Sequence, residues 1–513
     1  SSRILTPMNV RVSWRYSLSL TGTIVKWLAA PLCFPLLVAL YYAEPVAPFL
    51  VTIGLAIGGG GLLERLKRLD GDERLGPREA LLMVALTWLL VALVSAVPFV
   101  VAGRGTIAHP INAAFEAMSG ITTTGATVLR EFDIHARSIM MWRQLTQWLG
   151  GLGILILATA ILSRLSVGGA QLMETETQYD NVDKLTPHIE DTARLIGKLY
   201  AGLTIGTIAV LYGLYLVGLA PNMDLYTAVA HAFTSVSTAG FSTEPLSIEA
   251  FAPVVHWVLI VVMFLGSTSF VLMYFVLQGN IERLRNSEEF RFYLGTVIVF
   301  SALVMTILTL KQNPTGGGFS DTLRQSVFNV VSIITTTGYA NADFDLWSPF
   351  AKHLLLMCMF LGGMAGSTTC SIKAFRWLVV FKSFRRDLFT VIHPEAIRPV
   401  RLGGTTVDEQ TVRNVYAYTL IAIVGVFFVT VLIVVDGART GLYQIGEFGE
   451  FDALGAAAST FLNIGPAFGP AGPYGTYDVF SMSTKAALVV IMWIGRIEII
   501  PVLVLFTRSF WQS

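Results

Sequence analysis

The sequence predicts an all-α polytopic membrane protein with an N-terminal two-helix hairpin and four pseudo-symmetric repeats of helix, re-entrant loop and helix. Three observations predict it: an apolar composition, ten long apolar runs, and four similar glycine-centred turns between those runs. Of the 513 residues, 54% are hydrophobic and 13% are charged, whereas a soluble domain usually carries about 25% charged residues. The net charge of +1 gives no sign of a nucleic-acid partner, and we expect none.

The ten apolar runs are the candidate membrane spans, because a spanning helix needs about 20 mostly apolar residues. They lie at 25–42, 47–63, 80–102, 139–162, 196–219, 254–277, 292–310, 353–375, 415–435 and 486–506. The second run is the weakest, because it contains the four glycines from Gly58 to Gly61. With the N-terminus inside, 25 of the 35 lysines and arginines fall on the inner side and nine on the outer side. This bias predicts a multi-pass protein with cytoplasmic N- and C-termini.

A half-length apolar segment follows the third, fifth, seventh and ninth runs. Each segment ends in a turn of small residues around one glycine: Gly125, Gly240, Gly338 and Gly465. We therefore expect a hairpin at 1–70 and four repeats at 71–180, 181–285, 286–400 and 401–513. All four loops enter from one side, so the repeats are parallel and related by an axis along the membrane normal.

Four short re-entrant loops indicate one shared central pore. A segment of about 12 residues cannot span as a helix, and non-helical backbone at membrane depth is tolerated only in protein or against water. Glycine permits a positive φ, rings of backbone carbonyls replace the hydration shell of a potassium ion, and helix C-termini favour a cation. A single TTTG string also fits an ordinary helix C-cap, but four copies in register favour helix–pore-loop–helix repeats.

The loop strings TTTGA, STAGF, TTTGYAN and NIGPAFGP resemble the pore loops of the TrkH/KtrB family of potassium uptake proteins. The extra hairpin resembles that of the TrkH branch. The resemblance implies potassium uptake across the bacterial inner (plasma) membrane through a gated, channel-like pore. It also implies a potassium-binding filter at Thr123, Thr124, Gly125, Thr238, Ala239, Gly240, Thr336, Thr337, Gly338, Asn463, Ile464 and Gly465. The fourth loop departs most, because it lacks the threonines. A serine at the first filter position accompanies sodium transport in part of the plant branch, so Gly125 implies a preference for potassium.

The eighth run contains a small, flexible string from Leu361 to Ser371, in which each glycine costs a helix about 1 kcal/mol. One interpretation is close helix packing through small residues. The other is a broken helix whose middle lies across the pore. The string resembles the GGxxGST loop that gates family members, which implies a gate at Gly362, Gly363, Gly366, Ser367 and Thr368.

Arg496 lies inside the last apolar run, where a charge costs at least about 2.5–3.5 kcal/mol without a polar cavity or a partner. It either pairs with a carboxylate such as Glu498, or reaches the inner face, or stands in the pore and repels cations. The GRxEI string resembles the family's C-terminal helix, which implies the third role and adds Arg496 to the gate.

Several other polar residues have simpler interpretations. Glu116 is expected at the start of the first half-helix, where it compensates the helix dipole or attracts cations. Arg143, Gln144 and Gln147 are expected to bond to neighbouring backbone. Asp343 and Asp345 either concentrate cations at the mouth or are solvated loop residues.

The resemblance also implies partners: a homodimer in the membrane and cytoplasmic nucleotide-binding regulatory subunits of the TrkA/KtrA type. The chain has no Walker pattern and no GxGxxG after a predicted strand, so we expect potassium as its ligand and no organic cofactor. We do not expect the chain to be an enzyme, because a membrane-embedded active site needs clustered polar residues and the seven histidines are scattered along the sequence. A potassium symporter coupled to protons or sodium stays open, although it would need buried titratable groups.

Overall fold

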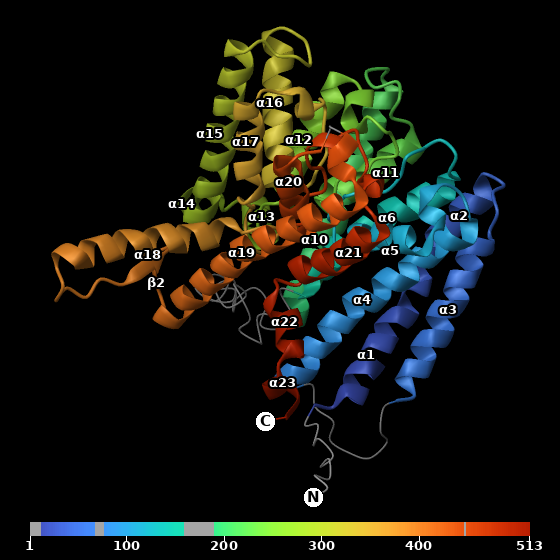
Figure 1. Cartoon of the computed structure of the whole chain (residues 1–513), viewed down its shortest axis with the longest axis horizontal. Coiled ribbons are helices and arrows are strands. Elements are labelled where there is room, and N and C mark those ends of the chain that lie inside the picture. The colour runs from blue at the N-terminus through green and yellow to red at the C-terminus, as the bar shows by residue number, and fades with distance from the viewer. Residues whose placement is uncertain (1–11, 67–75, 158–188, 446–447, 513) are drawn as a thin grey trace, which may run out of the picture.

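The structure is a computed structural model that describes residues 12–66, 76–157, 189–445 and 448–512, and helices dominate it (Figure 1). Three helices form the N-terminal part: α1 (Trp14–Trp27), α2 (Ala29–Tyr41) and α3 (Ala47–Glu64). In Figure 1 they lie together on one flank of the molecule, against α4.

The N-terminal hairpin is held by a close contact between two glycines. A methyl group added to Gly22 of α1 would lie 2.6 Å from the carbonyl oxygen of Gly60 in α3, and one added to Gly60 would lie 2.5 Å from that of Gly22. Of the four glycines that weakened the predicted second run, Gly60 therefore serves helix packing, and that run is helical. The first helix begins at Trp14, earlier than predicted. Its polar residues Ser17 and Thr21 can be buried there, because their hydroxyl groups donate hydrogen bonds to backbone carbonyls of α4 and, for Thr21, also of α1 itself.

Four copies of one unit make up the rest of the membrane domain. The units are α4 (Pro77–Ala102), α5 (Pro110–Ile121) and α6 (Arg137–Leu157); α10 (Ile189–Leu216), α11 (Leu225–Val236) and α12 (Pro253–Gly266) with α13 (Phe270–Leu277); α15 (Glu288–Leu310), α16 (Phe319–Ile334) and α17 (Pro349–Met359); and α19 (Glu409–Thr440), α20 (Glu450–Phe461) and α21 (Met482–Arg496). The remaining elements are α14 (Ile281–Asn286), α18 (Ala374–Ile392), β1 (Val400–Leu402), β2 (Thr405–Val407), α22 (Ile500–Leu503) and α23 (Arg508–Gln512). The two strands form an antiparallel hairpin in which Val400 is paired with Val407.

The middle helix of each unit is short and buried. Helices α5, α11 and α20 have 12 residues and α16 has 16, so a 12-residue one rises only about 18 Å. Buried positions follow one another along their C-terminal halves, for example from Phe115 to Ile121 in α5. These half-helices fill the centre of the bundle, as the predicted fold requires.

The prediction of ten continuous spans is wrong for three of the runs, at 254–277, 353–375 and 486–506. Among the described residues, six helices are long and apolar enough to cross a membrane, or seven if the bent pair α12 and α13 counts as one span. That pair bends by 106°, and the run at 353–375 divides into α17 and α18 with non-helical chain between them. In the last run, α21 stops at Arg496. The fourth run is helical as far as Leu157, and its residues 158–162 lie outside the described residues. At the two internal breaks, serine, threonine and glycine bond to other segments and lower helix propensity.

Candidate ion pathway

The four predicted loops share one backbone conformation. In each, the residue two before the central glycine and the glycine itself have positive φ: Thr123 (55°) and Gly125 (84°), Thr238 (50°) and Gly240 (86°), Thr336 (58°) and Gly338 (88°), Asn463 (58°) and Gly465 (117°). The fourth loop therefore repeats the geometry of the other three despite its different sequence, because asparagine tolerates the left-handed region.

Hydrogen bonds to the preceding half-helix fix each loop. The amides of Thr124 and Gly125 both donate to the carbonyl of Ser119, at 2.9 and 3.4 Å. In the second and third loops the corresponding two amides donate to the carbonyls of Thr234 and Ser332, and in the fourth loop the amide of Ile464 donates to that of Ser459. The loop backbone is thus held from behind by the half-helix.

The four glycines form a closed ring. A methyl group added to Gly125 would lie 2.3 Å from the carbonyl oxygen of Ala239 in the next loop. The same holds around the ring: 1.8 Å from Gly240 to the oxygen of Thr337, 2.2 Å from Gly338 to that of Ile464, and 2.7 Å from Gly465 to that of Thr124. Real Cβ atoms almost never approach closer than 3.0 Å, so each loop needs a glycine where the next loop's carbonyl reaches it. This arrangement gathers four main-chain oxygens from four repeats at one place.

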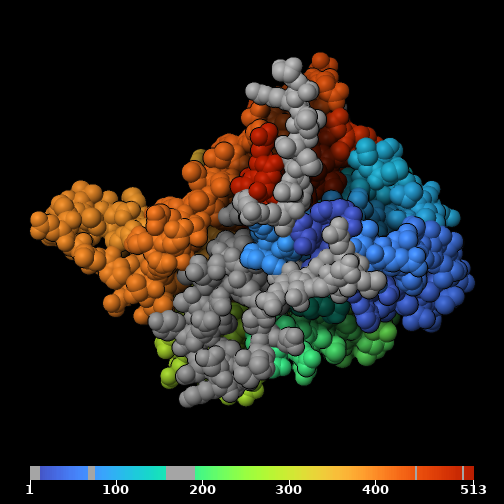
Figure 2. Space-filling model, turned by 90° about the horizontal axis from the view of Figure 1, so that it is seen from below, coloured from blue at the N-terminus to red at the C-terminus, as the bar shows by residue number. Residues whose placement is uncertain are grey.

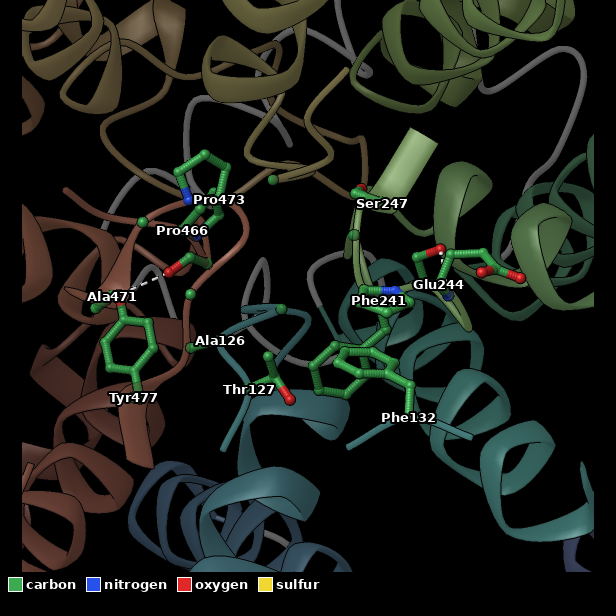
Figure 3. Close-up of a pocket in the computed structure, with 18 of the residues that line it drawn as sticks. Ala126, Thr127, Phe132, Phe241, Glu244, Ser247, Pro466, Ala471, Pro473 and Tyr477 are labelled. Atoms are coloured by element: carbon green, nitrogen blue, oxygen red, sulfur yellow. Dashed lines mark hydrogen bonds between the residues drawn. The ribbon is translucent and has the colours of Figure 1, made fainter. Parts of the chain in front are cut away.

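A hollow opens on the side of the ring where the loops leave it. All four central glycines line this hollow. Other lining residues include Phe132, Phe241, Glu244, Pro466 and Tyr477 (Figure 3). Among the described residues that line the hollow, Glu244 is the only one with a carboxylate side chain. Burial raises the pKa of this carboxyl group. Sequence analysis missed Glu244, because a single carboxylate after a loop carries no pattern.

Side chains from the flanking segments hold individual loop carbonyls. Gln147 of α6 donates to the carbonyl of Ala239 at 3.0 Å, and Tyr477 donates its hydroxyl hydrogen to that of Gly465 at 2.7 Å. The Asn463 amide donates to the Thr124 hydroxyl at 2.9 Å and so links the fourth loop to the first. A carbonyl oxygen has two lone pairs, so these bonds leave each oxygen able to accept a second interaction.

A buried ion pair ties the first loop to the second. The Arg143 guanidinium donates to Glu116 at 2.7 Å and to the carbonyl of Ser242 at 2.8 Å, and it lies 3.7 Å from the centre of the Phe241 ring. Glu116 accepts from Thr127 and from the amide of Val128, which follow the first filter glycine. The predicted role of Glu116 is wrong: it lies in the middle of α5, fully buried, rather than at an exposed N-terminus.

The predicted gate string lies on the opposite side of the ring, where the loops enter it. Residues 360–373 are non-helical. The hydroxyl of Thr368 bonds to that of Thr238 at 2.9 Å, the amide of Cys370 donates to Thr336 at 2.9 Å, and the Cys370 thiol lies 3.5 Å from the Thr123 hydroxyl. This segment therefore contacts three of the four predicted filter loops directly. Its amides also bond to the break between α12 and α13, for example from Met364 to the carbonyl of Ser267.

Arg496 completes these contacts from the fourth repeat. Its guanidinium is 3% exposed and donates to the carbonyl of Thr368, at 3.3 and 3.4 Å, and to the thiol of Cys370. Glu498 instead accepts from Arg376 at 2.5 Å and pairs with Lys373 at 3.2 Å. Of the partners that the sequence suggested, Glu498 therefore gives Arg496 no hydrogen bond within the described part of the chain.

The structure thus brings the twelve predicted filter residues together in four adjoining loops. Of the predicted gate string, Thr368 contacts a filter loop directly, and Arg496 bonds to the same segment at Thr368 and Cys370. Asp345 is only partly solvated: its side chain is 28% exposed, and it accepts from the amide of Gly469 at 2.7 Å and so braces the chain after the fourth loop. Burial raises the pKa of Asp343, whose carboxylate accepts from the amide of Asp345.

A polytopic helical chain whose four re-entrant loops meet in a carbonyl-lined ring is a membrane transport protein, and residues 61–513 match the family described as TrkH, cation transport protein. The chain belongs to this family. It is 33% identical over 509 residues to the Trk system potassium uptake protein TrkH of Halomonas elongata, covering 98% of this chain and 100% of that protein. It is 32% identical over 498 residues to the TrkH of Escherichia coli K12, covering 96% and 98%. The crystal structure of the potassium transporter TrkH from Vibrio parahaemolyticus superposes with a TM-score of 0.84 at 28% identity, covering 98% and 100%.

Proposed function

We propose that the chain takes up potassium ions across the bacterial inner membrane through a gated pore, with both termini in the cytoplasm. The filter comprises the three residues that end at each central glycine, from Thr123–Gly125 to Asn463–Gly465. The observation that carries the proposal is the closed ring in which each glycine faces the next loop's carbonyl oxygen. The names of the relatives, potassium uptake proteins of the Trk system, supply the ion.

The ring has the chemistry that a dehydrated monovalent cation requires. Carbonyl oxygens from four loops replace water ligands, and the C-termini of α5, α11, α16 and α20 end at the loops and contribute partial negative charge. One glycine per loop makes a short filter. Glu244 at the hollow adds a carboxylate that attracts cations to the mouth.

The gate in this proposal is the segment containing Gly362, Gly363, Gly366, Ser367 and Thr368, together with Arg496. The segment blocks the path by its position against three filter loops. The positive charge of Arg496 raises the electrostatic barrier to a cation leaving the filter. Opening then requires the segment to give up its bonds to Thr238 and Thr336.

The working assembly we propose is a homodimer in the membrane with cytoplasmic nucleotide-binding regulatory subunits of the TrkA/KtrA type. Within one chain, the division is the hairpin at 1–70 and repeats at 71–180, 181–285, 286–400 and 401–513. Each repeat supplies one filter loop, so one chain forms one complete pore.

Flux measured in liposomes tests this function against coupled transport. Protein reconstituted with potassium inside and no gradient of protons or sodium should carry potassium down its own electrochemical gradient, with potassium and its close congener rubidium preferred over sodium. Flux that appears only when a proton or sodium gradient is imposed would favour a symporter and would overturn the pore. Empty liposomes and the Gly240→Ala variant serve as controls.

A further inference from the structure

A basic hollow lies far from the filter, beside α18 and the β-hairpin. Its lining includes five cationic side chains, from Lys382, Arg385, Arg386, Arg398 and Arg401, with Pro399 and Val400. The space-filling view shows the lobe of α18 and the hairpin projecting from the body of the molecule (Figure 2). The hollow is therefore open to molecules outside the protein.

Three of the five cations have no acidic partner within the described part of the chain. Lys382 pairs with Glu288, and Arg386 pairs with Glu409 and Asp387. Among the described residues, no ion pair involves Arg385, Arg398 or Arg401, all of which are exposed. The hollow thus carries an uncompensated positive charge that fits an anionic group of matching size.

An exposed apolar face borders the same hollow. On α18, Phe381, Phe384, Leu388 and Val391 are 52%, 58%, 53% and 78% exposed. Their spacing of three and four residues places them on one side of the helix. Arg385 lines the hollow and lies one turn from both Phe381 and Leu388, so it joins the basic hollow to the apolar stripe.

The direction of α18 fits a helix at a membrane surface. In Figure 1 it runs across the direction of α15 and α17, and Lys382 binds it to Glu288 at the first residue of α15. It therefore lies at the level where a span enters the membrane. A helix with an apolar face and basic neighbours at that level binds in the plane of the interface, and anionic lipids of the inner leaflet attract basic groups there.

From the unpaired arginines, the exposed stripe and the position of α18, we infer that this hollow binds the phosphodiester headgroup of an anionic phospholipid whose acyl chains lie along α18. The occupant is a lipid rather than a free phosphate, because the stripe gives the chains a surface that inorganic phosphate would not use. An acidic protein surface would match the arginines but would leave four large apolar side chains facing water.

The test is lipid binding to the purified full-length chain in a non-ionic detergent, measured by native mass spectrometry with phosphatidylglycerol and phosphatidylcholine of the same chain length. Phosphatidylglycerol should bind more tightly. The triple variant Arg385→Gln, Arg398→Gln, Arg401→Gln should weaken its binding by about 10- to 100-fold and leave phosphatidylcholine unchanged. The matched control, Arg285→Gln, Arg291→Gln, Arg413→Gln, removes the same charge from exposed arginines outside the hollow and should bind as the unmodified protein does.

Two further arms decide between the sources of the phosphate. Glycerophosphate, which has no acyl chains, should fail to compete with phosphatidylglycerol. The double variant Phe384→Ser, Leu388→Ser should weaken the binding of phosphatidylglycerol, although it retains all five cations. The proposal would be overturned if the triple variant of the hollow and the control triple variant lost phosphatidylglycerol binding equally, or if glycerophosphate competed fully. Melting temperatures near that of the unmodified protein establish that each variant is folded, and none of these readouts depends on ion flux.

Discussion

Replacing Gly240 by alanine is the sharpest perturbation of the proposed filter. The added methyl group would lie 1.8 Å from the carbonyl oxygen of Thr337, where ordinary contact begins at 3.4 Å. The oxygen must therefore retreat by about 1.6 Å, the difference between those distances. Alanine at the observed φ of 86° adds about 1–2 kcal/mol of backbone strain.

The expected loss of flux follows from the displaced oxygen. An interaction between a polar group and a charge contributes about 1.5–3 kcal/mol, and each 1.4 kcal/mol is a factor of ten. Losing one of the four carbonyl ligands should therefore lower potassium flux by about 10- to 150-fold, and it should also narrow the preference for potassium over sodium. Both quantities are measured with isotopic rubidium and sodium in liposomes.

The matched control is Gly295→Ala in α15. Nothing lies within 4 Å of a methyl group added at Gly295, and alanine favours the helix by about 1 kcal/mol over glycine. This variant should therefore retain full flux. A Gly240→Ala protein that is folded and transports potassium at the unmodified rate with unchanged selectivity would refute the carbonyl ring as the filter.

Three other perturbations test the supporting parts of the account. Arg496→Ala removes the charge held against Thr368 and should raise potassium flux by about tenfold; unchanged flux at normal expression would remove the arginine from the gate. Glu116→Gln leaves the buried guanidinium of Arg143 without its carboxylate and should destabilise the protein by about 3–5 kcal/mol, seen as a lower melting temperature; an unaltered melting temperature would contradict a stabilising role for this ion pair. Burial opposes ionisation of Asp478, but hydrogen bonds from Lys485 and Arg130 hold the pKa of that carboxyl below its usual value, so its stabilising effect is present at neutral pH and is lost as the pH falls below about 4. The difference in melting temperature between the unmodified protein and Asp478→Asn should accordingly shrink as the pH falls through that range, and a constant difference would contradict this assignment.

The four central glycines of the loops could be located from sequence, because their conformational requirement is local. The central position of each loop has a φ between 84° and 117°, which favours glycine, and this demand recurs four times at similar places between apolar runs. Even the divergent fourth loop meets it through Gly465. The contacts between loops could not be located in this way, because nothing in one string specifies which carbonyl faces Gly125.

Ion pairs were the least predictable feature. Sequence proximity suggested Glu498 as a partner for Arg496, but Glu498 and Ile499 have positive φ and the chain turns there. The carboxylate then meets Arg376, which is 122 residues away. Long-range contacts of this kind depend on how complete repeats pack, which composition and periodicity do not encode.

Anomalous diffraction from crystals grown in rubidium tests most directly the central claim that the ring of carbonyl oxygens binds the transported cation. The account predicts a rubidium peak on the axis of the ring, coordinated by the carbonyl oxygens of Thr124, Ala239, Thr337 and Ile464. A peak bound elsewhere, with those four oxygens turned away from it, would contradict the account.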